Sequence, residues 1–427
     1  MKNQGRIVKI GIFGLCRGGA FYNQIMVNNG EIVAVCDMDE KKLARAKELL
    51  GNDVATYTDF DEFINHEGLE AVFLGNFFHE HAPYAIKALE KNIHVISECT
   101  SNGTMAEGVA LVRAAEKSKA IYMISENYPY MVFNQEMHKV CRSGKLGKVL
   151  YAEGEYNHPF DTYGDMKGFK GLHPYGTHWR QLLPKTYYIT HSLAPLMYIT
   201  GATPKRVMAL PCHVAEPADS PYADTLIPDR TAVLMTLNDD ESVFRVTGCA
   251  AFGGHENSYR VCGMRGQIEN IRGTKEINLL YNSWQVPEGE ERKQRYTPEF
   301  DEEDREIIEK AGHGGGDYYV IKEFFRCIRE GRKHMFDEYF ATTMASVAIL
   351  GHRSLLEKGV PYDIPDFRLE EDRKKYENDY STPFYGSDGS KPTIRNCSDP
   401  DYVYGDEQVA RYDEIMKDVE YKPYFEA

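Results

Sequence analysis

Over the first 127 residues, short apolar segments rich in β-branched residues alternate with segments whose apolar residues recur at helical spacing. Strands are predicted over residues 6–14, 31–37, 70–76, 94–98 and 121–127, and helices between them over 40–50, 81–92 and 107–120. Alternation of this kind buries a parallel sheet between two layers of helices. The sequence therefore predicts an α/β fold that begins with a doubly wound domain over residues 1–127.

A different pattern follows residue 127, and a chain of 427 residues is long enough for a second domain. A helix over 134–147 precedes longer predicted strands over 148–158, 205–216, 231–239 and 242–252, and helices are expected over 317–331 and 338–359. The polar residues 238–241 predict a hairpin between the last two strands. We expect residues 128–365 to form an open, largely antiparallel sheet with helices on one face.

Two polar stretches lie outside these patterns. Residues 288–310 are highly charged, and we interpret them as a solvated loop that leads into a helix. Residues 366–427 are polar and rich in tyrosine and turn-forming residues, so we expect them to form a tail that wraps over the body of the protein.

Charge and cysteine usage limit the possible partners. The formal net charge is −15 and the basic residues are dispersed, which argues against nucleic-acid binding. No apolar run approaches the ~20 residues of a membrane span and no signal-peptide core precedes the first strand, so we expect a cytoplasmic protein. The nine cysteines form no C-x-x-C pair, and the histidines of 79–81 and 173–178 match no standard ligand spacing. Reduced thiols and no metal site are therefore predicted.

The segment "GIFGLCRGGA" follows the first predicted strand and opens a helix, which is the context of a dinucleotide-binding turn. Gly14 makes the tight turn, while Gly18 and Gly19 allow the helix amides to approach a pyrophosphate. Cys16 stands where the pattern has its second glycine, so its side chain must turn away from the phosphates. Asp37 ends the second strand, where a carboxylate accepts both ribose hydroxyls and repels a 2′-phosphate. This favours NAD over NADP. The alternative to cofactor binding is that the glycine segment is a purely structural turn.

The segment "TYYITHSLAPL" over residues 186–196 places a phenol and an imidazole three residues apart. If the segment is helical, Tyr188 and His191 share a face and their polar atoms can reach one small volume suited to proton transfer. The alternative is that both are hydrogen-bonded residues of a first helical turn, with Thr190 as its N-cap.

Four segments, "GIFGLCRGG", "VCDMDEKKLARAKELLG", "HAPYAIKALEKNIHVISE" and "SGKLGKVLYAEGEY", resemble the Gfo/Idh/MocA oxidoreductases. The resemblance extends nearly to Pro361 and implies a Rossmann domain, an open-sheet domain, and a sugar bound where the two meet. Dehydrogenases of this family carry Glu-Lys-Pro after the fifth strand, whereas this chain has Glu98-Cys99-Thr100. The missing lysine argues against an ordinary alcohol dehydrogenase.

A narrower resemblance is carried by "ISENYPY", "EGEYNH", "THWR", "YYITHSLAPL" and "HGGGDYYVIKEFFRCIREG". These segments are similar to a glycosidase branch of the family, the α-N-acetylgalactosaminidase type with permanently bound NAD. The resemblance implies four active-site residues, Tyr188, His191, Tyr156 and Glu126. The chain departs from the branch at Ile189, where a proline is usual, and at residues 192–194, where Ser-Leu-Ala replaces Gly-Leu-Gly.

This branch implies hydrolysis without net redox change. Oxidation at the sugar C3 acidifies the C2 hydrogen, the C1 substituent is eliminated, water adds, and the ketone is reduced again. We assign His191, with Tyr188, to the C3 oxygen and Tyr156 to the C2 proton. Glu126 lies at the end of the last predicted strand of the first domain, where ligands of open α/β sheets bind, although a surface carboxylate is the alternative.

Further residues complete the predicted site. The residues expected to contact NAD are Gly14, Cys16, Arg17, Gly18, Gly19, Asp37, Asn76, His81, Glu98 and Asn127. The residues expected to contact the sugar are His178, Trp179, Arg180, His313 and Asp317, because aromatic faces pack on pyranoses and arginine donates paired hydrogen bonds. Core packing is the alternative for Trp179, a glycine-rich helix entry is the alternative for residues 313–317, and a structural role is the alternative for His81.

The sequence is compatible with three functions. The first is a redox-neutral NAD-dependent glycosidase or related lyase, the second an NAD-dependent sugar or inositol dehydrogenase, and the third a non-catalytic NAD-binding regulator. A small-molecule carbohydrate or glycoside is the expected ligand, and a homo-oligomer the expected assembly.

Overall fold

The computed structural model describes residues 5–158, 182–213, 227–250, 253–300, 305–386, 389–403 and 410. Its first sheet has six parallel strands in the order β3-β2-β1-β4-β5-β6. The strands are β1 (Val8–Phe13), β2 (Gly30–Cys36), β3 (Ala55–Tyr57), β4 (Ala71–Leu74), β5 (His94–Ser97) and β6 (Tyr122–Ile124). This order is that of a Rossmann fold, which confirms the predicted doubly wound domain.

The helices of this domain are α1 (Leu15–Gly18), α2 (Tyr22–Val27), α3 (Glu40–Leu50), α4 (Phe60–Phe63), α5 (His81–Glu90) and α6 (Met105–Lys117). The prediction matched both ends of α3, whose N-cap Asp39 accepts a hydrogen bond from the Lys41 amide. It missed β3 and α4, which have only three and four residues and therefore show no recognisable periodicity.

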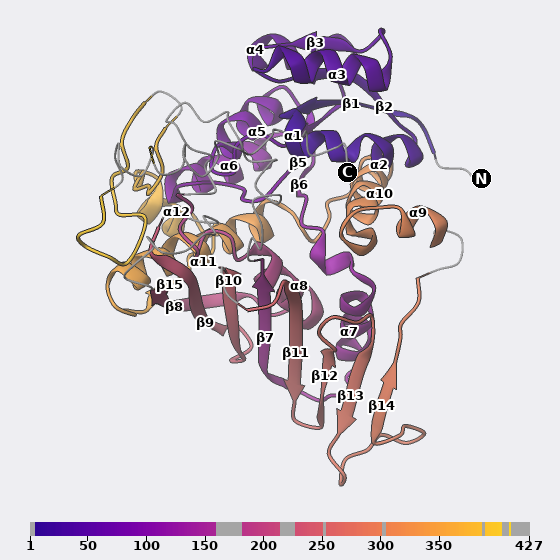
Figure 1. Cartoon of the computed structure of the whole chain (residues 1–427), viewed down its shortest axis with the longest axis vertical. Coiled ribbons are helices and arrows are strands. Elements are labelled where there is room, and N and C mark those ends of the chain that lie inside the picture. The colour runs from indigo at the N-terminus through magenta and orange to yellow at the C-terminus, as the bar shows by residue number, and fades with distance from the viewer. Residues whose placement is uncertain are drawn as a thin grey trace.

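A nine-stranded sheet forms the lower part of the molecule in Figure 1, in the order β14-β13-β12-β11-β7-β10-β9-β8-β15. Its strands are β7 (Val149–Asn157), β8 (Pro204–His213), β9 (Asp229–Asn238), β10 (Val243–Ala250), β11 (Glu256–Gly263), β12 (Gly266–Asn270), β13 (Ile277–Tyr281), β14 (Lys293–Tyr296) and β15 (Tyr362–Asp363). Its neighbouring strands are antiparallel except for the β7–β10 pair. The largely antiparallel sheet and the β9–β10 hairpin were correctly predicted.

Further helices and short turns follow the first sheet in the chain. They are η2 (Tyr128–Tyr130), α7 (Val132–Arg142), α8 (Thr190–Thr200), α9 (Arg305–Glu309), η7 (His313–Gly315), α10 (Gly316–Glu330), α11 (Glu338–Leu356) and α12 (Glu370–Tyr376). Of these, η2 and α7 connect the first sheet to the second sheet. Apolar side chains from both sheets and these helices form one continuous buried core. No helix within the described residues is both long and apolar enough to cross a membrane.

Two local details differ from the sequence analysis. Thr190, the N-cap in the alternative interpretation of this segment, is the first residue of α8; Ile189 occupies the cap position and no side chain caps the helix. The charged segment 288–310 contains strand β14 besides the expected start of a helix, since the edge of the sheet accepts a polar strand with one exposed face.

The described part of the C-terminal segment contacts both sheet domains. Arg373 on α12 pairs with Glu116 on α6, and Arg353 on α11 forms a bidentate ion pair with Asp379 at 2.6 and 2.8 Å. The Phe384 ring stacks on His79 at a centroid distance of 4.4 Å. These contacts hold residues 366–386 against the body of the protein.

Candidate active site

The predicted polar residues of the first domain gather at one edge of its sheet. Asp37 follows β2, Asn76 follows β4, Glu98 follows β5 and Glu126 follows β6. Because parallel strands present their carboxyl ends at the same edge, these side chains line the side where ligands of such sheets bind. The second domain adds Tyr156 near the end of β7 and His191 at the start of α8.

The turn after β1 has the shape that a dinucleotide requires. Gly14 adopts φ +85°, and a Cβ there would lie 2.5 Å from the backbone of Gly75 and Asn76. A Cβ on Gly18 would lie 2.5 Å from the Ile12 side chain, so the helical segment packs directly on the sheet. The amides of this turn are thereby held where a pyrophosphate can approach them.

The surrounding acceptors also fit NAD. The buried Asp37 carboxylate accepts a hydrogen bond from the Leu15 amide at 2.8 Å, which places it beside the glycine turn. The Oδ1 atoms of Asn76 and Asn127 are buried, and neither has a hydrogen-bond partner among the described residues. Hydroxyl and amide donors of NAD can satisfy such acceptors. Cys16 is partly exposed, and burial raises the pKa of its thiol.

Arg17 links the glycine turn to the second domain. Its Nε donates to Glu98 at 2.9 Å, and its two terminal nitrogens donate to Asp317 on α10 at 3.2 and 2.9 Å. Asp317 also accepts from Asn127 Nδ2 at 2.6 Å and lies 3.0 Å from His313 Nδ1. Burial acts to raise the pKa of Asp317, but Arg17 and His313 outweigh it and hold that pKa well below its usual range.

This network changes the interpretation of several predicted contacts. Arg17 and Glu98 were expected to bind the cofactor, and Asp317 to bind the sugar, yet all three are ion-paired. Arg17 pairs with Glu98 within the first domain and with Asp317 across the two domains. Asp317 is 2% exposed, so its carboxylate has little surface to offer a sugar. His313, by contrast, is partly exposed and lies beside Tyr128 at a ring distance of 5.8 Å.

Three predicted catalytic groups form one hydrogen-bonded chain. The Tyr188 hydroxyl lies 3.3 Å from His191 Nε2, and His191 Nδ1 lies 2.7 Å from Glu126 Oε1. Tyr188 is partly exposed, His191 is buried and Glu126 is fully buried. The tyrosine end of this chain is therefore its accessible end, and Glu126 is linked to Tyr188 only through His191.

Cys99 closes the buried end of this chain. Its thiol donates to Glu126 Oε2 at 3.1 Å. Burial raises the pKa of Cys99 well above its ordinary value, so the group is a thiol and can donate. Burial also acts to raise the pKa of Glu126, but His191 and Cys99 outweigh it and lower that pKa. The residue that replaces the family lysine thus stabilises an ionised, buried glutamate.

Packing of α8 on the sheet brings His191 into place. In the β7–β11 register Gly154 lies opposite Tyr259, and a Cβ on Gly154 would lie 2.1 Å from the Ser192 carbonyl oxygen. The helix can therefore approach β7 closely only because residue 154 has no side chain. The Tyr259 hydroxyl then donates to the His191 carbonyl at 2.5 Å.

Aromatic rings enclose the His191 imidazole. The Tyr156 ring is perpendicular to it at 4.8 Å, and the Tyr128 ring is stacked on it at 4.0 Å with an interplanar angle of 18°. The Phe78 ring lies 5.4 Å from that of Tyr188. Sequence reasoning did not identify Tyr128, Phe78 or Cys99 as part of the site. Only the position of Tyr128, two residues beyond Glu126, offered a signal.

Other predicted positions lie elsewhere or outside the described residues. His178, Trp179 and Arg180 fall in the segment 159–181, which the structure does not describe. His81 begins α5, with Nδ1 2.7 Å from the Thr100 carbonyl, and burial lowers its pKa to about 4. It is therefore neutral at pH 7. Within the described ranges no three histidine, cysteine or acidic side chains are grouped to hold a metal.

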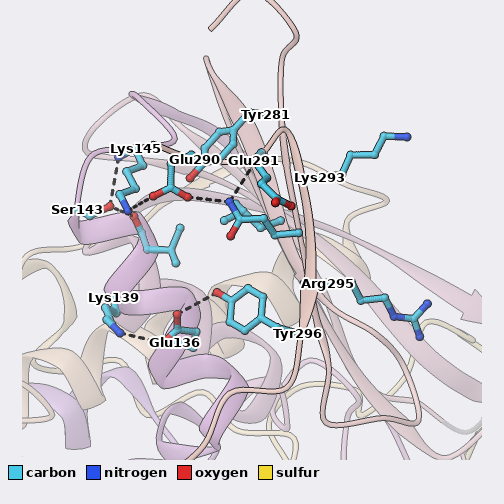
Figure 2. Close-up of a pocket in the computed structure, with 13 residues that line it drawn as sticks. Glu136, Lys139, Ser143, Lys145, Tyr281, Glu290, Glu291, Lys293, Arg295 and Tyr296 are labelled. Carbon is cyan, nitrogen blue, oxygen red and sulfur yellow. Dashed lines mark hydrogen bonds and ion pairs between the residues drawn. The ribbon is translucent and has the colours of Figure 1, made fainter. Parts of the chain in front are cut away.

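A separate cavity of about 550 Å³ lies between α7 and the β13–β14 hairpin (Figure 2). Its polar side chains pair with one another: Tyr296 donates to Glu136 at 2.9 Å, and Lys145 pairs with Glu290. None of the predicted site residues lines this cavity. This cavity is therefore separate from the described residues of the predicted site.

Comparison with known proteins gives two matching family models. Residues 8–126 match the oxidoreductase family with an NAD-binding Rossmann fold, and residues 231–373 match the C-terminal domain of glycosyl hydrolase 109. A glycosyl hydrolase family 109 protein of Bacteroides fragilis is 24% identical over 405 residues, covering 84% of this chain and 85% of that protein. A relative of the same description from Porphyromonas gingivalis is 22% identical, with 84% of each chain covered.

Solved structures share the fold. Levoglucosan dehydrogenase in complex with NADH and L-sorbose aligns with a TM-score of 0.69 at 16% identity, covering 85% of this chain and all of that one. An aldose-aldose oxidoreductase from Caulobacter crescentus aligns with a TM-score of 0.66 at 17% identity, with 84% and 100% coverage. Both likenesses support the two-domain architecture described above.

Proposed function

We propose that this chain, which belongs to the Gfo/Idh/MocA oxidoreductases and carries a glycosyl hydrolase 109 C-terminal domain, cleaves glycosides with NAD as a recycled cofactor. The observation that carries the proposal is the chain of hydrogen bonds from the partly exposed Tyr188 through His191 to the buried Glu126. Such a chain can move a proton at a sugar hydroxyl without leaving an unpaired charge in the protein interior.

NAD, when bound, supplies a hydride acceptor for sugar oxidation and later the hydride for re-reduction. The side chains of the protein transfer the protons. Tyr188 takes the proton of the C3 hydroxyl and passes its own to His191 Nε2, and Glu126 compensates the charge on the imidazole through Nδ1. Return of that proton accompanies re-reduction of the ketone, so the acid–base groups end in their starting states.

Tyr156 is proposed to exchange the C2 proton. Its ring lies 4.8 Å from that of His191 and 5.6 Å from that of Tyr188, so it borders the same volume. Loss of the C2 proton and of the C1 substituent is followed by addition of water and return of a proton to C2. The sum is one glycosidic bond and one water consumed, with a free sugar and an alcohol formed.

The test measures glycoside cleavage and nicotinamide absorbance together on chromogenic α- and β-glycosides. We expect product release without accumulation of NADH, and in heavy water we expect deuterium at C2 of the released sugar. NADH formed in proportion to product would instead identify a sugar dehydrogenase, and product without C2 label would identify direct displacement.

We further propose a homo-oligomer that acts in the cytoplasm. Met208, Leu210, Met235 and Leu237 are exposed on neighbouring strands β8 and β9, which is typical of a surface that pairs with another protein. All nine cysteines carry free thiols, as expected in a reducing compartment. Light scattering of the purified protein tests the assembly, because a monomer at micromolar concentration would contradict it.

A further inference from the structure

The Tyr128 ring lies directly against the His191 imidazole, to which its own side chain makes no hydrogen bond among the described residues. It lies on η2, immediately after the strand end that carries Glu126, and is 5% exposed. Its ring stacks on the imidazole at 4.0 Å with the two planes within 18° of parallel. The Tyr128 ring also meets the Tyr156 ring edge-on, with the two centroids 5.5 Å apart.

The groups that face His191 come from five places in the fold, and they restrain different parts of its side chain and backbone. They are Glu126 after β6, Tyr188 before α8, Tyr156 on β7, Tyr259 on β11 and Tyr128 on η2, with Cys99 acting through Glu126 and His313 beyond Tyr128. The Glu126 contact fixes one ring nitrogen. A single hydrogen bond still permits the imidazole to tilt about it, because terminal ring torsions have broad minima.

We propose that Tyr128 is a positioning residue that holds the plane of the His191 imidazole, so that Nε2 stays directed at Tyr188 while Nδ1 stays on Glu126. The proposal rests on the function proposed above. Stacked aromatic pairs are favourable beyond their buried area and constrain orientation as well as distance. Tilting of the imidazole would lengthen the 3.3 Å contact between Nε2 and the Tyr188 hydroxyl, on which proton transfer depends.

Two substitutions separate the ring of Tyr128 from its hydroxyl. Tyr128→Phe keeps the ring stacked on His191 and loses only the hydroxyl, whereas Tyr128→Leu loses both. Tyr130→Leu is the matched control, because Tyr130 lies on the same η2 turn and is equally buried but faces His334 and Phe336. Tyr128→Met provides a second unstacked variant if Tyr128→Leu does not fold.

The experiment has one readout that requires turnover and one that does not. Nitrogen-15 NMR of the histidine-labelled NAD complex detects the His191 Nδ1–H proton held on Glu126, and steady-state kinetics separates kcat from KM. We expect Tyr128→Leu to weaken or broaden the Nδ1–H signal and to lower kcat roughly 10- to 100-fold with KM little changed. Tyr128→Phe should keep the signal and most of kcat, and Tyr130→Leu should keep both.

Two results would overturn the proposal: an unchanged Nδ1–H signal in the unstacked variant, or the same loss of signal in Tyr130→Leu. Failure of the proposed function gives a different result, in which the wild-type protein cleaves no glycoside. In that case the NMR comparison still decides whether Tyr128 orients His191.

Discussion

Glu126 and Glu136 lie ten residues apart, each beside a tyrosine and a basic group, but they differ in burial and in the chemistry that we expect of them. Glu126 is fully buried and is bonded to His191 and Cys99. Glu136 is about one-fifth exposed at the rim of the cavity in Figure 2, where Tyr296 donates to it and Lys139 lies 3.5 Å away. The two glutamates have partners of similar chemical type, so they differ mainly in how far their surroundings exclude water.

Burial decides what each carboxylate can do. Water can replace the partners of an exposed ion pair, and such pairs contribute about 0–1 kcal/mol. Water cannot replace the partners of the buried Glu126, where removal of one partner leaves a polar group unpaired in the interior. We therefore expect the Glu136 carboxylate to have no part in the reaction, whereas the Glu126 carboxylate is proposed to belong to a coupled proton-transfer chain.

The largest expected effect is that of Glu126→Gln. The amide has the shape of the carboxylate but no charge to compensate a protonated His191. We expect turnover of glycoside to fall about 10³-fold, within the range of lost acid–base assistance. Circular dichroism and NAD titration check that the variant folds and binds cofactor. Turnover within a few-fold of wild type would show that burial of Glu126 has no catalytic consequence.

Asp317→Asn tests a second buried carboxylate. Asn at this position removes one of the two anionic partners of Arg17 and leaves Glu98 as the other, and loss of one member of a buried pair costs about 3–5 kcal/mol. Because the folded pKa of Asp317 is depressed, its stabilisation is present above the ordinary carboxyl range near pH 4 and is lost as pH falls below it. Denaturant unfolding should therefore give the variant a free energy of unfolding about 3 kcal/mol lower than that of wild type at pH 7. This difference should narrow below about pH 4, and a difference independent of pH would contradict the assignment.

Tyr188→Phe and His191→Ala address the exposed end of the same hydrogen-bonded chain. Each removes a proton-transfer group, so turnover should fall roughly 10²-fold or more while NAD affinity stays nearly unchanged. Kinetics on protein verified as folded provides the measurement. If the two residues are only structural, stability will fall by about 1–3 kcal/mol and activity per folded molecule will be preserved.

Asp37→Ala examines the cofactor turn rather than the proton-transfer chain. Without the carboxylate, the NAD ribose loses its acceptor, while NADP no longer meets a like charge. We expect NAD affinity to fall about 10-fold, equivalent to about 1.4 kcal/mol, and NADP affinity to fall less or to rise. Fluorescence titration with both reduced cofactors measures this, and equal weakening would place the ribose elsewhere.

The smallest expected effect is that of Glu136→Gln, which completes the comparison. Because the carboxylate is partly exposed, its loss should change unfolding free energy by less than about 1 kcal/mol and leave turnover unchanged. A loss of activity comparable to that of Glu126→Gln would show that the cavity between α7 and β14 participates in the reaction.

Local patterns in the sequence accounted for much of the architecture. Strand–helix alternation, the glycine turn at Gly14 and the acidic residue at the end of β2 depend on neighbouring residues, because periodicity and turn chemistry act over a few positions. The start of α8, with Tyr188 and His191 in contact, was also anticipated, although Tyr188 precedes the helix instead of lying in it. Short elements such as β3, α4 and β14 carry too little pattern to be recognised.

The sequence by itself therefore determined the two kinds of sheet, the cofactor turn and the candidate residues of the site. Only the tertiary structure decided their roles. Arg17 meets Asp317 across 300 positions, Cys99 meets Glu126 across 27, and Tyr128 meets His191 across 63. Such contacts follow from strand order, from the close approach of α8 to Gly154 and from burial, which set the charge and orientation of a side chain and have no signature in the local sequence.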